Sequence, residues 1–92
     1  MKSELKELAL TELVEDTKLY PRLGVDTTHV STLCEALRAG ATLPPIIVDK
    51  RSMSVVDGYH RVRAWRRVNG KDSLIPAEVV DYPDNMAMLI DA

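Results

Sequence analysis

The chain has 92 residues, which is enough for one small domain with a modest hydrophobic core. Its net charge of −2 excludes a generic binder of polyanions, because the overall field repels them. The single cysteine excludes an internal disulfide bond and fits a reducing compartment. No apolar run is long enough to span a bilayer, and the first residues lack the apolar segment of a signal peptide. We therefore expect a cytoplasmic protein.

The first part of the chain predicts a short strand followed by an irregular segment. We expect residues 1–4 to be disordered and the alternating apolar side chains between residues 5 and 13 to form a strand. Residues 14–24 contain Pro21, which prevents a continuous helix. Arg22 follows this proline, in what the composition alone describes as a surface turn.

Residues 26–39 give the clearest helical pattern. Asp26 or Thr27 can cap its N-terminus, and Gly40 can end it in a left-handed conformation. Because Cys34 falls on the apolar stripe, it fits a small core residue better than a reactive thiol. The stripe consists of Val30, Leu33, Cys34 and Leu37.

The next segment predicts a β-hairpin that leads into a second helix. The apolar run 46–48 is typical of a strand covered on both faces. Residues 50–52 predict a turn, and residues 53–56 predict the returning strand. A helix over residues 58–68 follows at once, with Tyr59, Val62, Trp65 and Val68 on its inner face and Arg63, Arg66 and Arg67 pointing away from it.

The last part of the chain predicts a strand over residues 73–81 and a third helix. Pro76 near the start of that strand favours an edge position or a bulge. Pro83 fits the first turn of the helix, whose apolar side is Met86, Leu89 and Ile90. The predicted fold class is α+β: one domain, residues 1–92, with a small mixed β-sheet and about three helices. The pattern stops unfinished at Ala92, so we expect a longer parent protein or a partner that covers this helix.

The segment that starts at Asp57 combines features that suit a phosphate group. Gly58 lets a ligand approach the backbone, because no Cβ stands there. The first N–H groups of the following helix lack intrahelical partners and lie at the positive end of its dipole. The side chains of His60, Arg61 and Arg63 add donors at the same place. The segment therefore predicts an anion site.

A purely structural interpretation stands beside this one. Asp57 is a good N-cap residue in any protein, and arginine on an exposed helix face is usually only solvated. The charge distribution favours a ligand, because residues 49–72 hold seven of the twelve Lys and Arg residues against three acids. A local basic patch on an acidic chain suits one phosphate-bearing ligand better than a long duplex. We expect His29 at the surface, without a second His or Cys at metal-ligand spacing.

Four stretches carry, in order, a resemblance to a known family: residues 21–22, 43–48, 58–64 and 75–79. The third is similar to the Gly-x-x-Arg-x-Arg-Ala box of the ParB/sulfiredoxin superfamily, and the likeness covers roughly residues 5–90. The resemblance implies that fold and a ligand cleft near the Pro-Arg pair. It assigns ligand or phosphate contacts to Gly58, Tyr59, His60, Arg61, Arg63 and Arg22.

The known activities of the superfamily require different residues in the box, and residues 58–64 match some of these patterns better than others. Sulfiredoxins carry a nucleophilic cysteine where Tyr59 stands, and a phenol with a pKa of roughly 10 does not replace a thiolate, which disfavours sulfinate reduction. ParB-type proteins hold the triphosphate of CTP there with Mg²⁺. Arg61, Arg63 and Ala64 match that pattern, whereas Tyr59 and His60 depart from it. The implied cofactor is a nucleoside triphosphate, CTP or ATP/ADP, with Mg²⁺, and the departures leave CTP selectivity and hydrolysis open.

An enzyme is the alternative. A kinase variant of this fold has Asp-Gly-His-His-Arg at the box, and the similarity of residues 57–61 makes Asp57 a candidate catalytic base for small-molecule phosphotransfer. NTP hydrolysis is a related alternative. A nuclease has also been claimed for the superfamily, but the sequence shows no cluster of carboxylates at metal-site spacing, so we assign no metal ligands.

The closest overall likeness is to the N-terminal domain of streptomycin-cluster-type transcriptional regulators, which carry a helix-turn-helix further on. The leading hypothesis is a ParB-like regulatory domain of a DNA-associated protein, of the transcription-regulator or partition type. It binds a nucleotide or another phosphate ligand. We expect DNA contacts mainly from sequence beyond Ala92 or from a partner, a homodimer as a compatible state, and no membrane contact.

Overall fold

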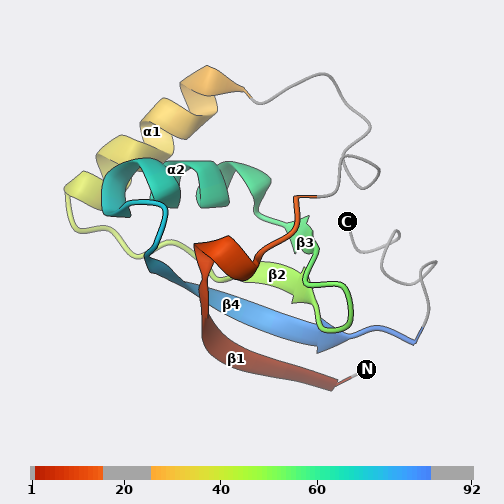
Figure 1. Cartoon of the computed structure of the whole chain (residues 1–92). Coiled ribbons are helices and arrows are strands. Elements are labelled where there is room, and N and C mark those ends of the chain that lie inside the picture. The colour runs from red at the N-terminus through yellow and green to blue at the C-terminus, as the bar shows by residue number, and fades with distance from the viewer. Residues whose placement is uncertain (1, 16–25, 84–92) are drawn as a thin grey trace.

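The computed structural model of the chain describes residues 2–15 and 26–83. Two α-helices and four strands alternate along it (Figure 1). The elements are β1 (Lys2–Ala9), the 3-10 helix η1 (Leu10–Glu12), α1 (Thr27–Arg38), β2 (Ile46–Asp49), β3 (Val55–Asp57), α2 (Tyr59–Asn69) and β4 (Leu74–Asp81). The predicted α+β class with a small mixed sheet is confirmed. The third helix was predicted on residues that lie outside the described part of the chain.

The four strands form one sheet in the order β1-β4-β2-β3. The long strand β4 pairs antiparallel with β1 and parallel with β2, and β2 pairs antiparallel with β3 as the predicted hairpin. Because β4 lies inside the sheet, the edge position predicted from Pro76 is wrong. The ladder with β2 begins at Ala77, so the proline, which has no N–H to donate, stands one residue outside it.

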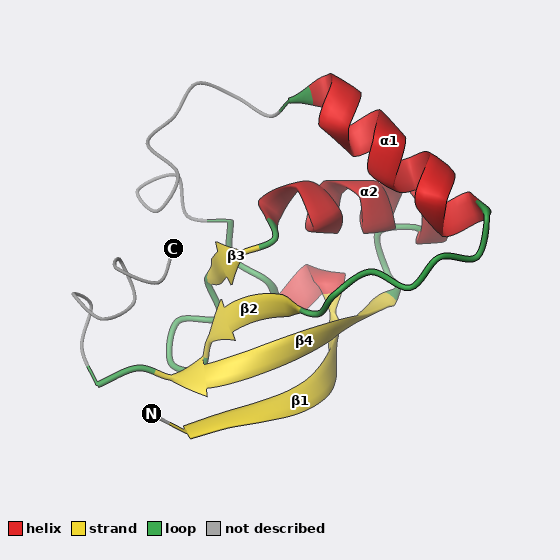
Figure 2. Cartoon of the chain, turned by 180° about the vertical axis from the view of Figure 1, so that it is seen from behind, coloured by secondary structure: helices red, strands yellow, loops and turns green. Residues whose placement is uncertain are grey.

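The two helices stack on one face of the sheet, with α2 between the sheet and α1 (Figures 1 and 2). The core between the sheet and α2 is aliphatic and is built around Val48, Val55 and Val62, none of which is exposed. A second cluster joins the helices through Val30, Cys34 and Ala64. Cys34 is buried there, as predicted. No helix in the described part of the chain is long and apolar enough to cross a membrane.

The N-terminal prediction needs two corrections. Residues 2–4 are not disordered but belong to β1, because the long strand β4 offers them partners at residues 79–81. The strand also ends at Ala9 rather than at residue 13, since the chain turns into η1 and buries Leu10. The segment 16–25, which contains Pro21 and Arg22, lies outside the described residues.

Helix α1 is capped as its sequence predicts. The side chain of Asp26 accepts hydrogen bonds from the backbone N–H groups of Thr28, at 3.0 Å, and His29, at 3.2 Å. At the other end, Gly40 has a φ of 88°, the left-handed conformation expected of a residue that ends a helix. The cap fixes where α1 begins, which matters because the site described below lies at this end.

Replacing Asp26 with alanine is expected to lower the free energy of unfolding by about 1 kcal/mol, because two N–H groups lose their acceptor. Asp26→Asn keeps a capping oxygen and should lose only a few tenths of that. Urea denaturation followed by circular dichroism measures both variants. A loss that is the same for alanine and asparagine would show that the cap contributes no stability.

Candidate functional site: a pocket at the start of helix α2

The chain passes from β3 into α2 through a left-handed glycine. Gly58 has a φ of 102°, and a Cβ added there would lie 2.7 Å from Cγ2 of Ile46. Glycine is therefore required both by the backbone conformation and by the lack of space. Gly58 itself is the N-cap residue of α2, and no side chain caps the helix. The interpretation of Asp57 as the N-cap is wrong.

Arg61 holds this turn in place. Its Nη1 donates hydrogen bonds to the carbonyl oxygens of Pro44, at 2.9 Å, and Pro45, at 3.0 Å. Its Nη2 lies 3.3 Å from Oδ2 of Asp57. A guanidinium has five N–H groups, so Nε and one hydrogen of Nη2 remain for other acceptors. That edge faces Gly58, and a ligand that approached the glycine would meet it.

His60 joins the starts of the two helices. Its Nε2 accepts a hydrogen bond from the backbone N–H of Asp26, at 3.2 Å. The hydrogen bond makes Nε2 an acceptor in this arrangement. The ring of His29 packs edge-on against that of His60, with 4.9 Å between the centroids. His60 therefore connects the starts of α1 and α2 through a hydrogen bond and a ring contact.

These residues surround a pocket of about 200 Å³. It is lined by Asp57, Gly58, Tyr59, His60, Arg61 and His29. The structure thus brings together five of the residues that the sequence singled out. His29 was missed as a pocket residue because nothing in the sequence says that α1 and α2 begin side by side. The signal that could have found it is weak, namely an imidazole in the first turn of a well-capped helix.

Arg63 does not line this pocket. Its Nη2 donates to the hydroxyl of Tyr59, at 2.7 Å, and its guanidinium carbon lies 5.2 Å from the centroid of that ring. The same nitrogen is 3.5 Å from Glu15, which also accepts a hydrogen bond from Arg66 at 2.8 Å. The hydrogen bond with Tyr59 raises the pKa of Arg63; partial burial opposes this effect and the charge of Glu15 adds to it. Arg63 is therefore linked to the pocket through Tyr59.

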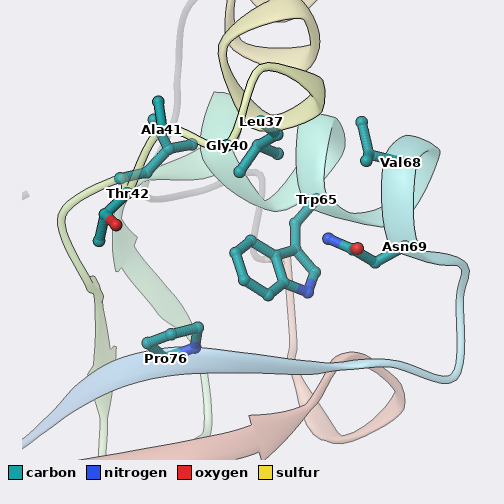
Figure 3. Close-up of a pocket in the computed structure, with 9 residues that line it drawn as sticks. Leu37, Gly40, Ala41, Thr42, Trp65, Val68, Asn69 and Pro76 are labelled. Carbon is teal, nitrogen blue, oxygen red and sulfur yellow. The ribbon is translucent and has the colours of Figure 1, made fainter.

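A second pocket, of about 260 Å³, lies at the other end of α2 (Figure 3). Its walls come from the end of α1, the segment after it, α2 and β4, with Trp65 between α2 and Pro76. Asn69 and Thr42 contribute polar side chains to it, and none of the lining residues in the described part of the chain is charged. A pocket without charge offers a phosphate group little, so the candidate phosphate site is the one at the start of α2.

The donor set places limits on a metal ion. No group of three or more His, Cys, Asp or Glu side chains in residues 2–15 and 26–83 could hold one. Asp57 is the one carboxylate among the described residues that line the pocket, and 58% of its side chain is exposed. Mg²⁺ commonly binds one or two carboxylates together with substrate phosphates. Asp57 therefore fits a Mg²⁺ that a nucleotide brings with it.

The family follows from comparison with known proteins. The family model for the ParB N-terminal domain matches residues 1–91. This chain belongs to the ParB N-terminal domain family. A curated ParB-like protein from Sulfolobus acidocaldarius is 38% identical over 71 residues, which cover 77% of this chain and 35% of the relative. The chain thus spans about a third of that relative's length. The predicted superfamily is confirmed, and the finer likeness to streptomycin-cluster regulators stays a prediction.

Solved structures show the same fold. A pNOB8-like ParB N-domain superposes with a TM-score of 0.73 at 16% identity, over 92% of this chain and 32% of that chain. The C-terminally truncated chromosome-partitioning protein ParB from Caulobacter crescentus, complexed with CTP-γ-S, superposes with a TM-score of 0.74. It is 22% identical, over 96% of this chain and 50% of that chain. At these identities the likeness establishes the fold alone.

Gly58→Ala is expected to destabilise the fold more than Gly40→Ala. Both glycines have positive φ, so alanine costs roughly 1–2 kcal/mol at either position. A Cβ at Gly40 would have no heavy atom within 4 Å, whereas one at Gly58 would clash with Ile46. That clash adds roughly 1–3 kcal/mol. Urea denaturation of both variants measures the difference, and equal losses would contradict the packing argument.

Proposed function

We propose that this chain is a regulatory module that binds a nucleotide, of the CTP or ATP/ADP class, or another phosphate ligand at the start of α2. The observation that carries the proposal is the helix start itself. Helix α2 begins at a left-handed glycine, has no side-chain cap, and faces a pocket. The unpaired donors and dipole of a helix N-terminus favour an anion, and the Nε and Nη2 edge of Arg61 lies beside Gly58 to donate to it.

The charges that line the pocket favour a Mg²⁺–nucleotide over the free nucleotide. The positive charge of Arg61 is offset by the carboxylate of Asp57. The negative charges of a free triphosphate would be repelled by the carboxylate of Asp57. A Mg²⁺ between this carboxylate and the phosphate oxygens turns the repulsive group into a ligand. We therefore expect binding to depend on Mg²⁺.

Arg63 and Arg22 are the remaining assigned contacts. Arg63 reaches a bound phosphate by exchanging the hydroxyl of Tyr59 for a phosphate oxygen, since 43% of its side chain is exposed. Arg22 keeps the ligand contact that the family resemblance assigns to it. The Caulobacter ParB complex with CTP-γ-S supports a nucleotide as the ligand class. Tyr59 and His60 depart from the ParB pattern, so base preference and hydrolysis are separate questions for experiment.

The proposal includes a DNA-associated parent protein, of the transcription-regulator or partition type. The net charge of the chain is −2, and two arginines of α2, Arg63 and Arg66, pair with the carboxylate of Glu15. DNA contacts are therefore assigned mainly to sequence beyond residue 92 or to a partner.

Arg61→Ala is expected to weaken binding of a Mg²⁺–nucleotide roughly 10- to 100-fold, because a charge-assisted hydrogen bond to phosphate contributes ~1.5–3 kcal/mol. Isothermal titration calorimetry with CTP, ATP and ADP, each with and without Mg²⁺, measures the effect. The free energy of unfolding without nucleotide is measured in parallel, because the substitution also removes the hydrogen bonds to Pro44 and Pro45.

Two further variants make this test specific. Arg67→Ala changes an exposed arginine of α2 that does not line the pocket and should leave the affinity unchanged. His29→Ala changes an exposed side chain that does line it and should weaken binding by a few-fold. If folded Arg61→Ala and His29→Ala both bind as the wild type does, or if the wild type binds none of the nucleotides, the ligand lies elsewhere.

Small-molecule phosphotransfer with Asp57 as catalytic base is the second candidate function. One observation favours it. Asp57 is not used as the helix cap, and its exposed carboxylate lies in the pocket beside the helix start that would hold the phosphate. The hydroxyl group of a phosphoryl acceptor bound there would lie within reach of the Asp57 carboxylate, which would take its proton.

Asp57→Asn is expected to abolish such transfer while the fold stays intact, because the amide oxygen still accepts from Arg61. The measurement is turnover of ATP or CTP with a panel of small hydroxyl compounds, together with the melting temperature of each protein. Turnover that survives the substitution would exclude the base role of Asp57. It would not contradict the proposal that the pocket binds a nucleotide.

A further inference from the structure

The outer edge of β1 is open. β1 is the terminal strand of the sheet order, and no described element lies beyond it in Figure 1 or Figure 2. Residues 2–7 are exposed, and Leu5, with 72% of its surface accessible, is the most exposed large hydrophobic residue in the described part of the chain. A strand edge of this kind presents a row of unpaired N–H and C=O groups that another strand can use.

We propose that this edge pairs antiparallel with the same edge of a second copy of the chain, so that two four-stranded sheets become one continuous sheet. Identical strands restrict the register of such a pair. In each copy only alternate residues turn their backbone groups towards the free edge. Residues that stand opposite each other must therefore both be even-numbered or both be odd-numbered.

Among the registers that remain, the one centred on Leu5 is complementary in charge. Glu4 stands opposite Lys6 of the second copy, and this happens twice because the pair is two-fold symmetric. Leu5 stands opposite Leu5 of the second copy and loses solvent. A shift by two residues in one direction places Glu4 against Glu4, and a shift in the other direction places Lys6 against Lys6. Like charges directly opposite each other are unfavourable, so the sequence of β1 disfavours both neighbouring registers relative to the one centred on Leu5.

The geometry of the single chain agrees with this register. Nζ of Lys6 already lies 3.7 Å from a carboxylate oxygen of Glu4 on the same face of β1. In the pair, these two residues and their copies form a square of alternating charges, and no backbone change is needed. One strand pair buries little area and its charges stay close to water, so the association is weak and reversible.

Sedimentation velocity over a series of protein concentrations tests the proposal. The wild-type chain should show a reversible monomer–dimer equilibrium. Lys6→Glu and Glu4→Lys should each raise the dissociation constant by about tenfold or more, because each replaces two attractive cross-strand pairs with two repulsive ones. An equimolar mixture of the two variants should associate as the wild type does, because one chain then presents two acidic and the other two basic side chains. The double variant Glu4→Lys/Lys6→Glu should do the same.

Matched controls separate register from net charge. Lys71→Glu and Glu12→Lys make the same charge changes at exposed positions outside β1 and should leave the dissociation constant unchanged. Circular dichroism confirms that every variant is folded. A wild type that is monomeric at all concentrations overturns the proposal. Association that responds equally to control and β1 variants, or a mixture that fails to restore it, overturns it as well.

Discussion

The contacts of one guanidinium hold the candidate site together. Arg61 ties the carbonyl oxygens of Pro44 and Pro45, at the start of β2, to the carboxylate of Asp57, at the end of β3, while it belongs to the first turn of α2. Three elements are thereby fixed relative to one another at the pocket. Only 18% of the Arg61 side chain is exposed, whereas 58% of the Asp57 side chain is, so water reaches the clamp from the side of the carboxylate.

We call these contacts of Arg61 with Pro44, Pro45 and Asp57 the clamp. They explain why residues of the box at 58–64 stabilise the fold even without a ligand. Gly58 must be a glycine because Ile46 and the Arg61 guanidinium fill the space where its Cβ would be. The same absence of a side chain leaves α2 without a cap and opens its N-terminus to the pocket. Structure and anion binding therefore make the same demands on Gly58 and Arg61. A substitution at either position acts on stability and on binding together, whereas His29 can be changed without disturbing the clamp.

Local rules predicted the local features of this chain well. The cap at Asp26, the left-handed Gly40 and the burial of Cys34 depend on a few neighbouring residues, and all three are as predicted. The predictions that were wrong concern features that depend on contacts between segments far apart in the sequence. The pairing of residues 2–4 needs the far end of β4, and the interior position of Pro76 follows from the crossover that places β4 beside β2. Likewise, only the packed fold shows that His29 joins the pocket and that Glu15 holds Arg63 away from it.

The position of the pocket determines which contacts between α1 and α2 a bound ligand would change. The core contacts of α1 are made with α2, through Val30, Cys34 and Ala64, rather than with the sheet. Asp26, the N-cap residue of α1, also contacts α2, because its backbone N–H donates a hydrogen bond to Nε2 of His60. A ligand that takes over this nitrogen removes the bond without touching the clamp of Arg61. Such a ligand acts on the position of α1, while the sheet and the start of α2 stay in place, because they are held by separate contacts.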